Sequence, residues 1–161
     1  MSKLTLAQLA PIISETLRSG NTVTFTPSGN SMYPFLRDKE NTVTVKSPDF
    51  PLSLYDIALF YDSDRRLVLH RVIATHDGYY DFCGDNRFVP EKNIPQSDIL
   101  GVVVSVGVNG ENINLSDKNY IKYCEKLAKR RKKLQKKASF AHVLRRAKNV
   151  FNKLFGKKKK S

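Results

Sequence analysis

The sequence predicts a mainly β protein with a short N-terminal helix and a basic, helical C-terminal extension. Three observations predict this fold class. Seven short runs of alternating apolar and polar residues follow one another without a helical segment between them. Dipeptides typical of hairpin turns separate two pairs of these runs. Most of the basic residues lie in the last part of the chain.

The first twenty residues have the spacing of an amphipathic helix. Leu6, Leu9, Ile13 and Leu17 lie three or four positions apart, and Gly20 follows as a stop signal. Polar residues interrupt this segment, so it lacks the continuous apolar core of a signal peptide. We therefore expect residues 1–20 to form a helix that packs on the body.

The body, residues 21–116, contains the period-two runs that predict strands. These runs cover residues 22–26, 42–46, 57–61, 67–75, 79–83, 100–108 and 112–115. Such a series without intervening helices predicts a barrel-like or sandwich-like domain. Asp77-Gly78 and Asn109-Gly110 predict two-residue hairpin loops.

Charge separates this body from a basic tail. Residues 117–161 contain 18 Lys or Arg and two acidic residues, a net charge of +16, whereas the first 116 residues carry −3. Residues 138–155 combine helical apolar spacing with basic positions, which predicts an amphipathic helix able to lie on an anionic membrane surface. Two alternatives are docking of its apolar face on the body and nucleic-acid binding through residues 129–137. The nucleic-acid alternative is the weaker one, because no aromatic residue interrupts that lysine-rich run.

Cysteine content and apolar run length bound the cellular setting. Cys83 and Cys124 provide neither a disulfide framework nor a metal-ligand spacing, so we expect a reducing environment and no metal or cofactor. The longest apolar run, residues 99–108, is about half of the ~20 residues that a membrane-spanning helix needs. The expected location is the cytoplasm, with peripheral association at the inner membrane face through the tail.

A turn around Ser31 is the first candidate for chemistry. Gly29 allows the chain to turn sharply, and the backbone N–H groups of such a turn can face a developing oxyanion. Ser31 is therefore a candidate nucleophile, with Gly29, Asn30 and Met32 at the oxyanion or substrate. Taken alone, this composition favours an ordinary solvated turn.

His70 is the candidate general base, because it interrupts a strand run and imidazole is the usual general base at physiological pH. A core histidine bonded to a backbone carbonyl is the alternative. If Asp77 and Gly78 form a two-residue loop, Asp85 lies directly opposite His70 and can orient the imidazole. A bulge in either strand would break this register. The resulting hypothesis is a Ser31, His70, Asp85 triad.

The order of these segments resembles the signal-peptidase and repressor-protease superfamily of serine peptidases. The resemblance rests on Gly29-Asn30-Ser31-Met32-Tyr33-Pro34, the strand at 42–46, and the segments 56–60, 69–73 and 84–86. His70-Arg71-Val72 and Gly84-Asp85-Asn86 are similar to the histidine branch, which includes the endoplasmic-reticulum and sporulation signal peptidases.

The resemblance implies the β fold of that superfamily and a serine endopeptidase that cleaves a peptide or leader segment after small residues. It assigns Ser31 as nucleophile, His70 as base and Asp85 as acidic partner, and the partner is a peptide or protein substrate. Two features depart from the family pattern: no membrane anchor is found, and Lys39-Glu40-Asn41 stands where a Gly-Asp pair is usual. The rival hypothesis is a catalytically silent β-domain binding module that its tail tethers to membrane or nucleic acid.

Overall fold

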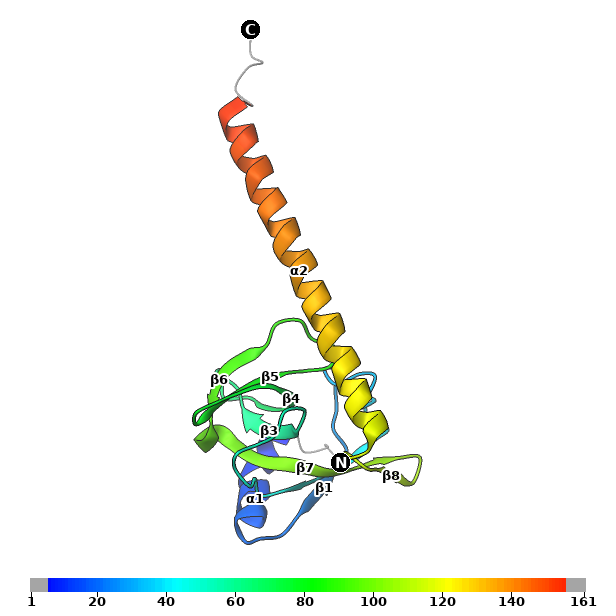
Figure 1. The fold of residues 1–161 in the computed structure, drawn as a ribbon. Coiled ribbons are helices and arrows are strands. Elements are labelled where there is room, and N and C mark those ends of the chain that lie inside the picture. Colours follow the sequence, from blue (N-terminus) through cyan, green and yellow to red (C-terminus); the bar gives the residue numbers. More distant parts are fainter. Residues whose placement is uncertain (1–5, 156–161) are drawn as a thin grey trace. The chain divides into compact units, whose positions relative to one another are not determined.

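The computed structural model describes residues 6–155 and confirms the mainly β fold. An eight-stranded antiparallel sheet follows helix α1 (Leu6–Arg18) along the chain and precedes helix α2 (Lys118–Phe155), and Figure 1 labels these elements. The strands are β1 (Val23–Phe25), β2 (Thr42–Lys46), β3 (Ile57–Tyr61), β4 (Leu67–His76), β5 (Tyr79–Cys83), β6 (Glu91–Pro95), β7 (Ile99–Val108) and β8 (Glu111–Ile113). A short 3₁₀ turn (Gln96–Asp98) precedes β7.

The strand order leaves β1 and β6 at the two ends of the sheet, and residues of both strands line one groove. The order is β1-β2-β7-β3-β4-β5-β6, and β8 pairs with β7 beside this path. β1 pairs with β2, and β6 pairs with β5. The outer side of each of these two end strands therefore retains backbone groups that another extended chain could pair with.

Both predicted hairpins form. His76 pairs with Tyr79 across Asp77-Gly78, and Val108 pairs with Glu111 across Asn109-Gly110. Asn109 and Gly110 have φ values of 51° and 85°. Positive φ at both central residues matches the twist of the flanking strands, which is why Asn-Gly is favoured there.

A bulge in β4 changes the register on the side of the sheet that matters for chemistry. Ala74 pairs with Asp81 as a two-residue loop predicts, but Val72 pairs with Phe82, one position short of its predicted partner. The extra residue in β4 displaces every later pair by one position. The prediction that Asp85 lies directly opposite His70 is therefore wrong.

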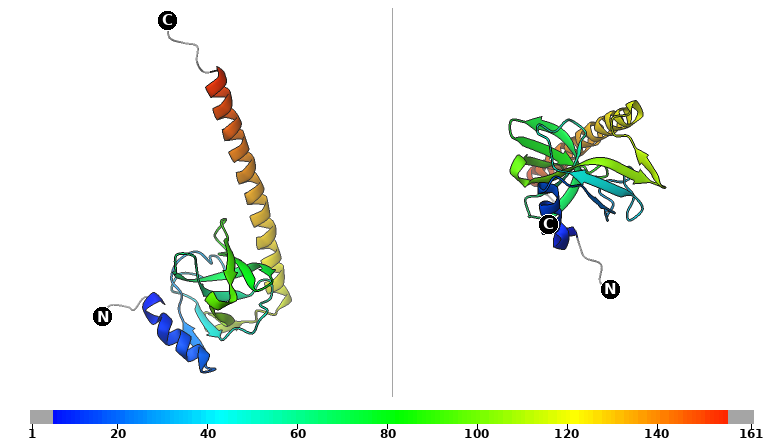
Figure 2. Two further views of the ribbon diagram at one scale, coloured as in Figure 1. Left: turned by 90° about the vertical axis from the view of Figure 1, so that its left-hand side faces the viewer. Right: turned by 90° about the horizontal axis from the view of Figure 1, so that it is seen from below.

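Strand β3 divides the hydrophobic core into two clusters, because successive side chains point to opposite faces. Ile57 and Leu59 belong to the cluster that includes Leu17 of α1, whereas Ala58 and Phe60 belong to the other. Burial on both faces explains why this strand is apolar throughout. Figure 2 shows α1 as a separate element on the outside of the sheet. Its buried residues Ile13 and Leu17 pack into the first of these clusters.

Strand β6 was not predicted from the sequence. Its residues, Glu91-Lys92-Asn93-Ile94-Pro95, include two charges and a terminal proline. Only Ile94 is buried, so the apolar alternation that identifies a strand is missing. A proline is tolerated here because β6 is an edge strand.

The chain forms two compact units, Met1–Glu125 and Lys126–Ser161. The first unit extends past the predicted end of the body at residue 116 and includes the first two turns of α2. In the second unit, Phe140 and Leu144 are exposed. The side chains of Val143, Ala147, Phe151, Leu154 and Phe155, which belong to the predicted amphipathic face, lie outside the described residues. Between residues 6 and 155, no helix has the length and apolar character needed to span a bilayer.

Candidate active site

A groove of about 1430 Å³ contains Ser31 and His70. It is larger than the roughly 300–1,000 Å³ of a typical small-molecule pocket, so it can hold an extended chain. Its lining comes from the end of β1 with the serine turn, the loop and first half of β4, and the segment from the end of β5 into β6. These segments contribute residues 25–29, 31–32, 62–63, 66–70, 86–92 and 94, together with Leu9, Leu36, Arg37 and Lys39.

The serine turn has the geometry that its sequence predicts. Gly29 has a φ of 102°, which favours glycine, and its N–H donates to Asp38 Oδ1 at 2.6 Å. Ser31 is half-buried, and the carbonyl of Asn30 accepts a hydrogen bond from Asn86 Nδ2 at 3.3 Å. Met32 is 4% exposed and belongs to the hydrophobic core, so its side chain anchors the turn beneath the groove.

His70 is held from one side by a carboxylate that the sequence analysis did not identify. Its Nδ1 lies 3.1 Å from Oε2 of Glu91, the first residue of β6. His70 is 5% exposed, and the ring of Phe60 meets it edge-on at a centroid distance of 6.3 Å. In the tautomer in which Nδ1 donates to this carboxylate, Nε2 is the nitrogen that can accept a proton.

Gly84 shows that Nε2 faces the serine turn. A Cβ placed on Gly84 would lie 3.0 Å from His70 Nε2 and 2.5 Å from the carbonyl oxygen of Ser31. The carbonyl oxygen of Ser31 and Nε2 of His70 therefore both border one small gap beside Gly84. A glycine is required because any side chain would fill that gap.

Asp85 pairs with Arg71. Its two carboxylate oxygens accept hydrogen bonds from Nε and Nη2 of Arg71 at 2.8 and 2.7 Å. This bidentate pair follows from the bulge in β4, which brings Gly84 rather than Asp85 to the histidine. The predicted role of Asp85 as the residue that orients His70 is thus not supported by its contacts.

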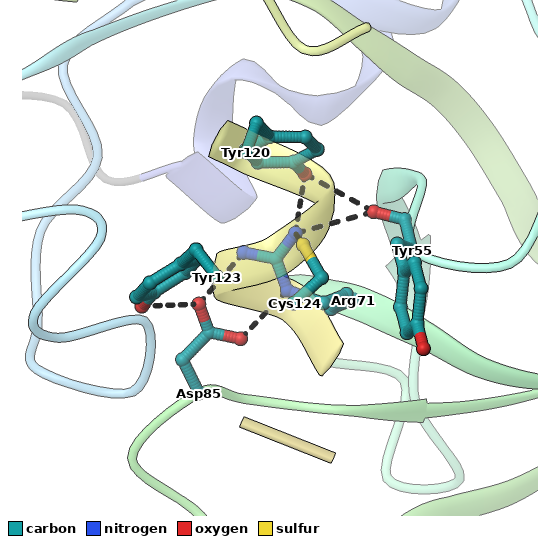
Figure 3. Close-up of polar contacts among 6 residues, drawn as sticks. All are labelled: Tyr55, Arg71, Asp85, Tyr120, Tyr123 and Cys124. Atoms are coloured by element: carbon teal, nitrogen blue, oxygen red, sulfur yellow. Dashed lines mark hydrogen bonds and ion pairs between the residues drawn. The ribbon is translucent and has the colours of Figure 1, made fainter. Parts of the chain in front are cut away.

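The Arg71–Asp85 pair is buried and linked to α2, as the close-up in Figure 3 shows. The Arg71 side chain is 2% exposed and that of Asp85 is 0% exposed. Burial lowers the pKa of Arg71, but its hydrogen bonds and charge attraction to Asp85 outweigh this, and the pKa is raised. Arg71 therefore stays charged, and the pair fixes the segment that follows β5.

Sequence reasoning missed Glu91 because it missed the strand that carries it. One signal was present: Glu91 is the only acidic residue between Asp85 and Asp98. Asp85 is bonded to Arg71. Between Asp85 and Asp98, only position 91 can therefore supply another carboxylate for His70.

The described part of the chain, residues 6–155, holds no group of three or more His, Cys, Asp or Glu side chains arranged to bind a metal ion. Ser31, His70 and Glu91 thus combine a hydroxyl, an imidazole and a carboxylate in a peptide-sized groove. No protein-family model and no curated protein sequence matches this chain.

Proposed function

We propose that the protein is a serine endopeptidase in which Ser31 is the nucleophile, His70 the general base and Glu91 the residue that orients His70. The supporting observation is the position of the imidazole. Glu91 occupies Nδ1, while Nε2 points to the small gap beside the Ser31 backbone. Glu91 takes the role that the sequence analysis assigned to Asp85.

The proposed chemistry is acyl transfer to the serine hydroxyl. Ser31 Oγ attacks the scissile carbonyl while His70 Nε2 accepts the hydroxyl proton, and Glu91 stabilises the resulting imidazolium. The backbone N–H of Ser31 is the proposed donor to the oxyanion, because the N–H of Gly29 donates to Asp38. His70 then gives the proton to the leaving amine, and a water activated by the same nitrogen hydrolyses the acyl-enzyme.

The proposed substrate is an extended peptide or leader segment. Two observations support this choice: the groove exceeds the size of a small-molecule pocket, and residues of both edge strands, β1 and β6, line it. An extended peptide can add to such an edge through backbone hydrogen bonds. Cleavage after small residues is the preference that the family resemblance implies.

Mass-spectrometric analysis of a peptide library tests this proposal. We expect the full-length protein to cleave a subset of peptides, and Ser31→Ala or His70→Ala to abolish the cleavage. Glu91→Gln keeps the size of the side chain but removes its charge, and an analogous change in a triad lowers kcat by up to about 10⁴-fold. Glu111→Gln, on β8 and outside the groove, is the matched control and should cleave like the wild type.

The same experiment can favour the rival class. A folded wild-type protein that cleaves no library peptide, with or without anionic vesicles, would favour the catalytically silent binding module. Cleavage that survives Ser31→Ala would also contradict the assignment of the nucleophile.

We also infer that the second unit brings the enzyme to an anionic membrane surface. Residues 126–161 contain 16 Lys or Arg and no acidic residue, and the exposed Phe140 and Leu144 add apolar contact. Basic residues held near an anionic surface contribute about 1 kcal/mol each.

Sedimentation of the full chain with phosphatidylcholine vesicles, with and without phosphatidylserine, tests the membrane proposal. We expect binding only with phosphatidylserine, weakened by salt and by Phe140→Ser/Leu144→Ser. Ile12→Ser, which removes an exposed apolar residue of α1, is the control. Equal binding of both vesicle types, or tight binding to oligouridylate with no vesicle binding, would refute membrane association, and the latter would favour nucleic acid.

A further inference from the structure

The first two turns of α2 contact the buried ion pair beside the candidate active site (Figure 3). Tyr123 donates its hydroxyl proton to Asp85 Oδ2 at 3.3 Å. Arg71 Nη1 donates to the hydroxyl of Tyr120 and to Cys124 Sγ, the latter at 3.3 Å. Both partners of the ion pair are therefore bonded to the same helix.

The carbonyl of Tyr55, which precedes β3, joins this part of α2 to Arg71. The Tyr120 hydroxyl donates to the carbonyl of Tyr55 at 3.2 Å, and Arg71 Nη1 donates to the same carbonyl, also at 3.2 Å. Tyr120 is 7% exposed and Cys124 is 1% exposed. Residues 118–125 thus form an integral part of the first compact unit.

The same tyrosines also pack on the serine turn. The ring of Phe35, four residues after Ser31, lies 5.3 Å from the ring of Tyr120 and 5.7 Å from that of Tyr123, centroid to centroid. The Arg71 guanidinium lies 5.1 Å from the centroid of the Phe35 ring. Aromatic pairs in this range contribute beyond their buried area. One helix face therefore contacts both loops that form the site.

A direct hydrogen bond joins those two loops. The N–H of Asn86 donates to the carbonyl of Ser31 at 2.8 Å. Asn86 follows Asp85, whose carboxylate is held by Arg71 and Tyr123. The chain of contacts from α2 to the Ser31 backbone therefore consists of one side-chain hydrogen bond, one covalent step along the chain and one backbone hydrogen bond.

We propose that Tyr120 and Tyr123 are positioning residues for the nucleophile: they hold the 84–86 and 29–36 loops at the separation that directs Ser31 to His70. This inference rests on the proposed peptidase function. Neither tyrosine is among the residues that line the groove. They act through Asp85, Arg71 and Phe35, and so influence the alignment of the serine more than the binding of peptide.

The protonation state of the two phenols fits this role. Burial raises the pKa of Tyr120 and of Tyr123 above the ordinary value of 10.0. Both hydroxyls therefore keep their protons at neutral pH, and Tyr123 remains a hydrogen-bond donor to the Asp85 carboxylate.

Steady-state kinetics on a peptide that the wild type cleaves tests the positioning role. Tyr123→Phe and Tyr120→Phe keep the rings on Phe35 and remove only the hydroxyls. We expect each to lower kcat about tenfold with KM within about twofold, since misalignment of reacting groups acts on the chemical step. Tyr79→Phe, at the exposed start of β5, is the matched control and should keep wild-type kinetics.

Hydrogen–deuterium exchange gives a second readout that needs no activity. In Tyr120→Phe/Tyr123→Phe, amides of residues 29–36 should exchange faster than in the wild type or in Tyr79→Phe, while amides of β3 stay protected. Unchanged kcat and unchanged exchange in the folded double variant would overturn the inference. A wild type that cleaves nothing would refute the peptidase proposal alone, because the exchange measurement still decides the positioning contacts.

Discussion

Gly84→Ala is the sharpest single test of the site geometry. The added Cβ would lie 2.5 Å from the Ser31 carbonyl oxygen, 2.9 Å from Arg87 Cγ and 3.0 Å from His70 Nε2. Gly84 has no positive φ, so backbone strain does not contribute to the effect. The methyl group therefore acts by pushing the serine turn and the imidazole apart.

The size of the effect follows from the distances. An ordinary contact begins at 3.4 Å, so the difference from 2.5 Å requires a displacement of about 0.9 Å between the two loops. Misplacing a reacting group by about 1 Å can cost about 10²-fold in rate, which corresponds to about 2.7 kcal/mol of activation free energy. Overpacking also lowers the free energy of unfolding, typically by about 1–3 kcal/mol.

The assay compares kcat/KM for one cleaved peptide between wild type, Gly84→Ala and Gly101→Ala. Gly101→Ala is matched in kind, because its Cβ would lie 3.0 Å from the backbone oxygen of Lys46 and from Leu17 Cδ1, outside the groove. We expect a loss of about 10²-fold for Gly84→Ala and nearly full activity for Gly101→Ala. A folded Gly84→Ala protein with activity within about twofold of wild type would refute the proposed arrangement of Ser31 and His70.

Three further predictions concern stability. Asp85→Asn leaves the buried Arg71 charge without its partner and should lower the free energy of unfolding, measured by urea denaturation, by about 3–5 kcal/mol. Asp49→Asn, in an exposed pair with Lys46, should lower it by no more than about 1 kcal/mol. Equal losses in the two variants would contradict the role of burial. Burial raises the folded-state pKa values of Tyr120 and Tyr123, so the stability that their neutral phenols contribute is present below about pH 10 and is lost as the pH rises further. The thermal midpoint of the wild type should therefore fall between pH 8 and pH 11, and it should fall by less in Tyr120→Phe/Tyr123→Phe. A fall of the same size in the double variant would argue against this role of the two phenols. Phe82→Ala removes a ring stacked on Phe60 at a centroid distance of 4.1 Å and should lower the unfolding free energy by about 3–5 kcal/mol in chemical denaturation. A loss below about 1 kcal/mol would contradict this prediction.

Local pattern sufficed for most of the sheet. Strands β2, β3 and β5 begin and end where apolar alternation predicts, and Asn109-Gly110 forms the predicted hairpin. These features depend on neighbouring residues only, through side-chain period and the φ values that glycine and asparagine accept. Strand β6 escaped because an edge strand buries little and so leaves no apolar pattern.

Local pattern likewise predicted two residues of the candidate site but not the third. Ser31 and His70 were identified from the sequence, and both line the groove. The choice of acid depended on cross-strand register, and one extra residue in β4 was enough to transfer Asp85 to Arg71. The Asp77-Gly78 turn determines the loop of the hairpin, but it does not determine whether a bulge forms farther along β4. The carboxylate beside His70 then came from the strand that pattern reasoning had missed.

The course of α2 also affects how the protein should be shortened for laboratory work. The change in charge after residue 116 suggests a cut there, which would remove Tyr120, Tyr123 and Cys124 and uncover the Arg71–Asp85 pair. In a chain shortened that way, the proposed activity would be lost for reasons unrelated to the basic segment. Ending the chain after Glu125 follows the boundary of the compact unit and would separate loss of the basic segment from damage to the candidate active site.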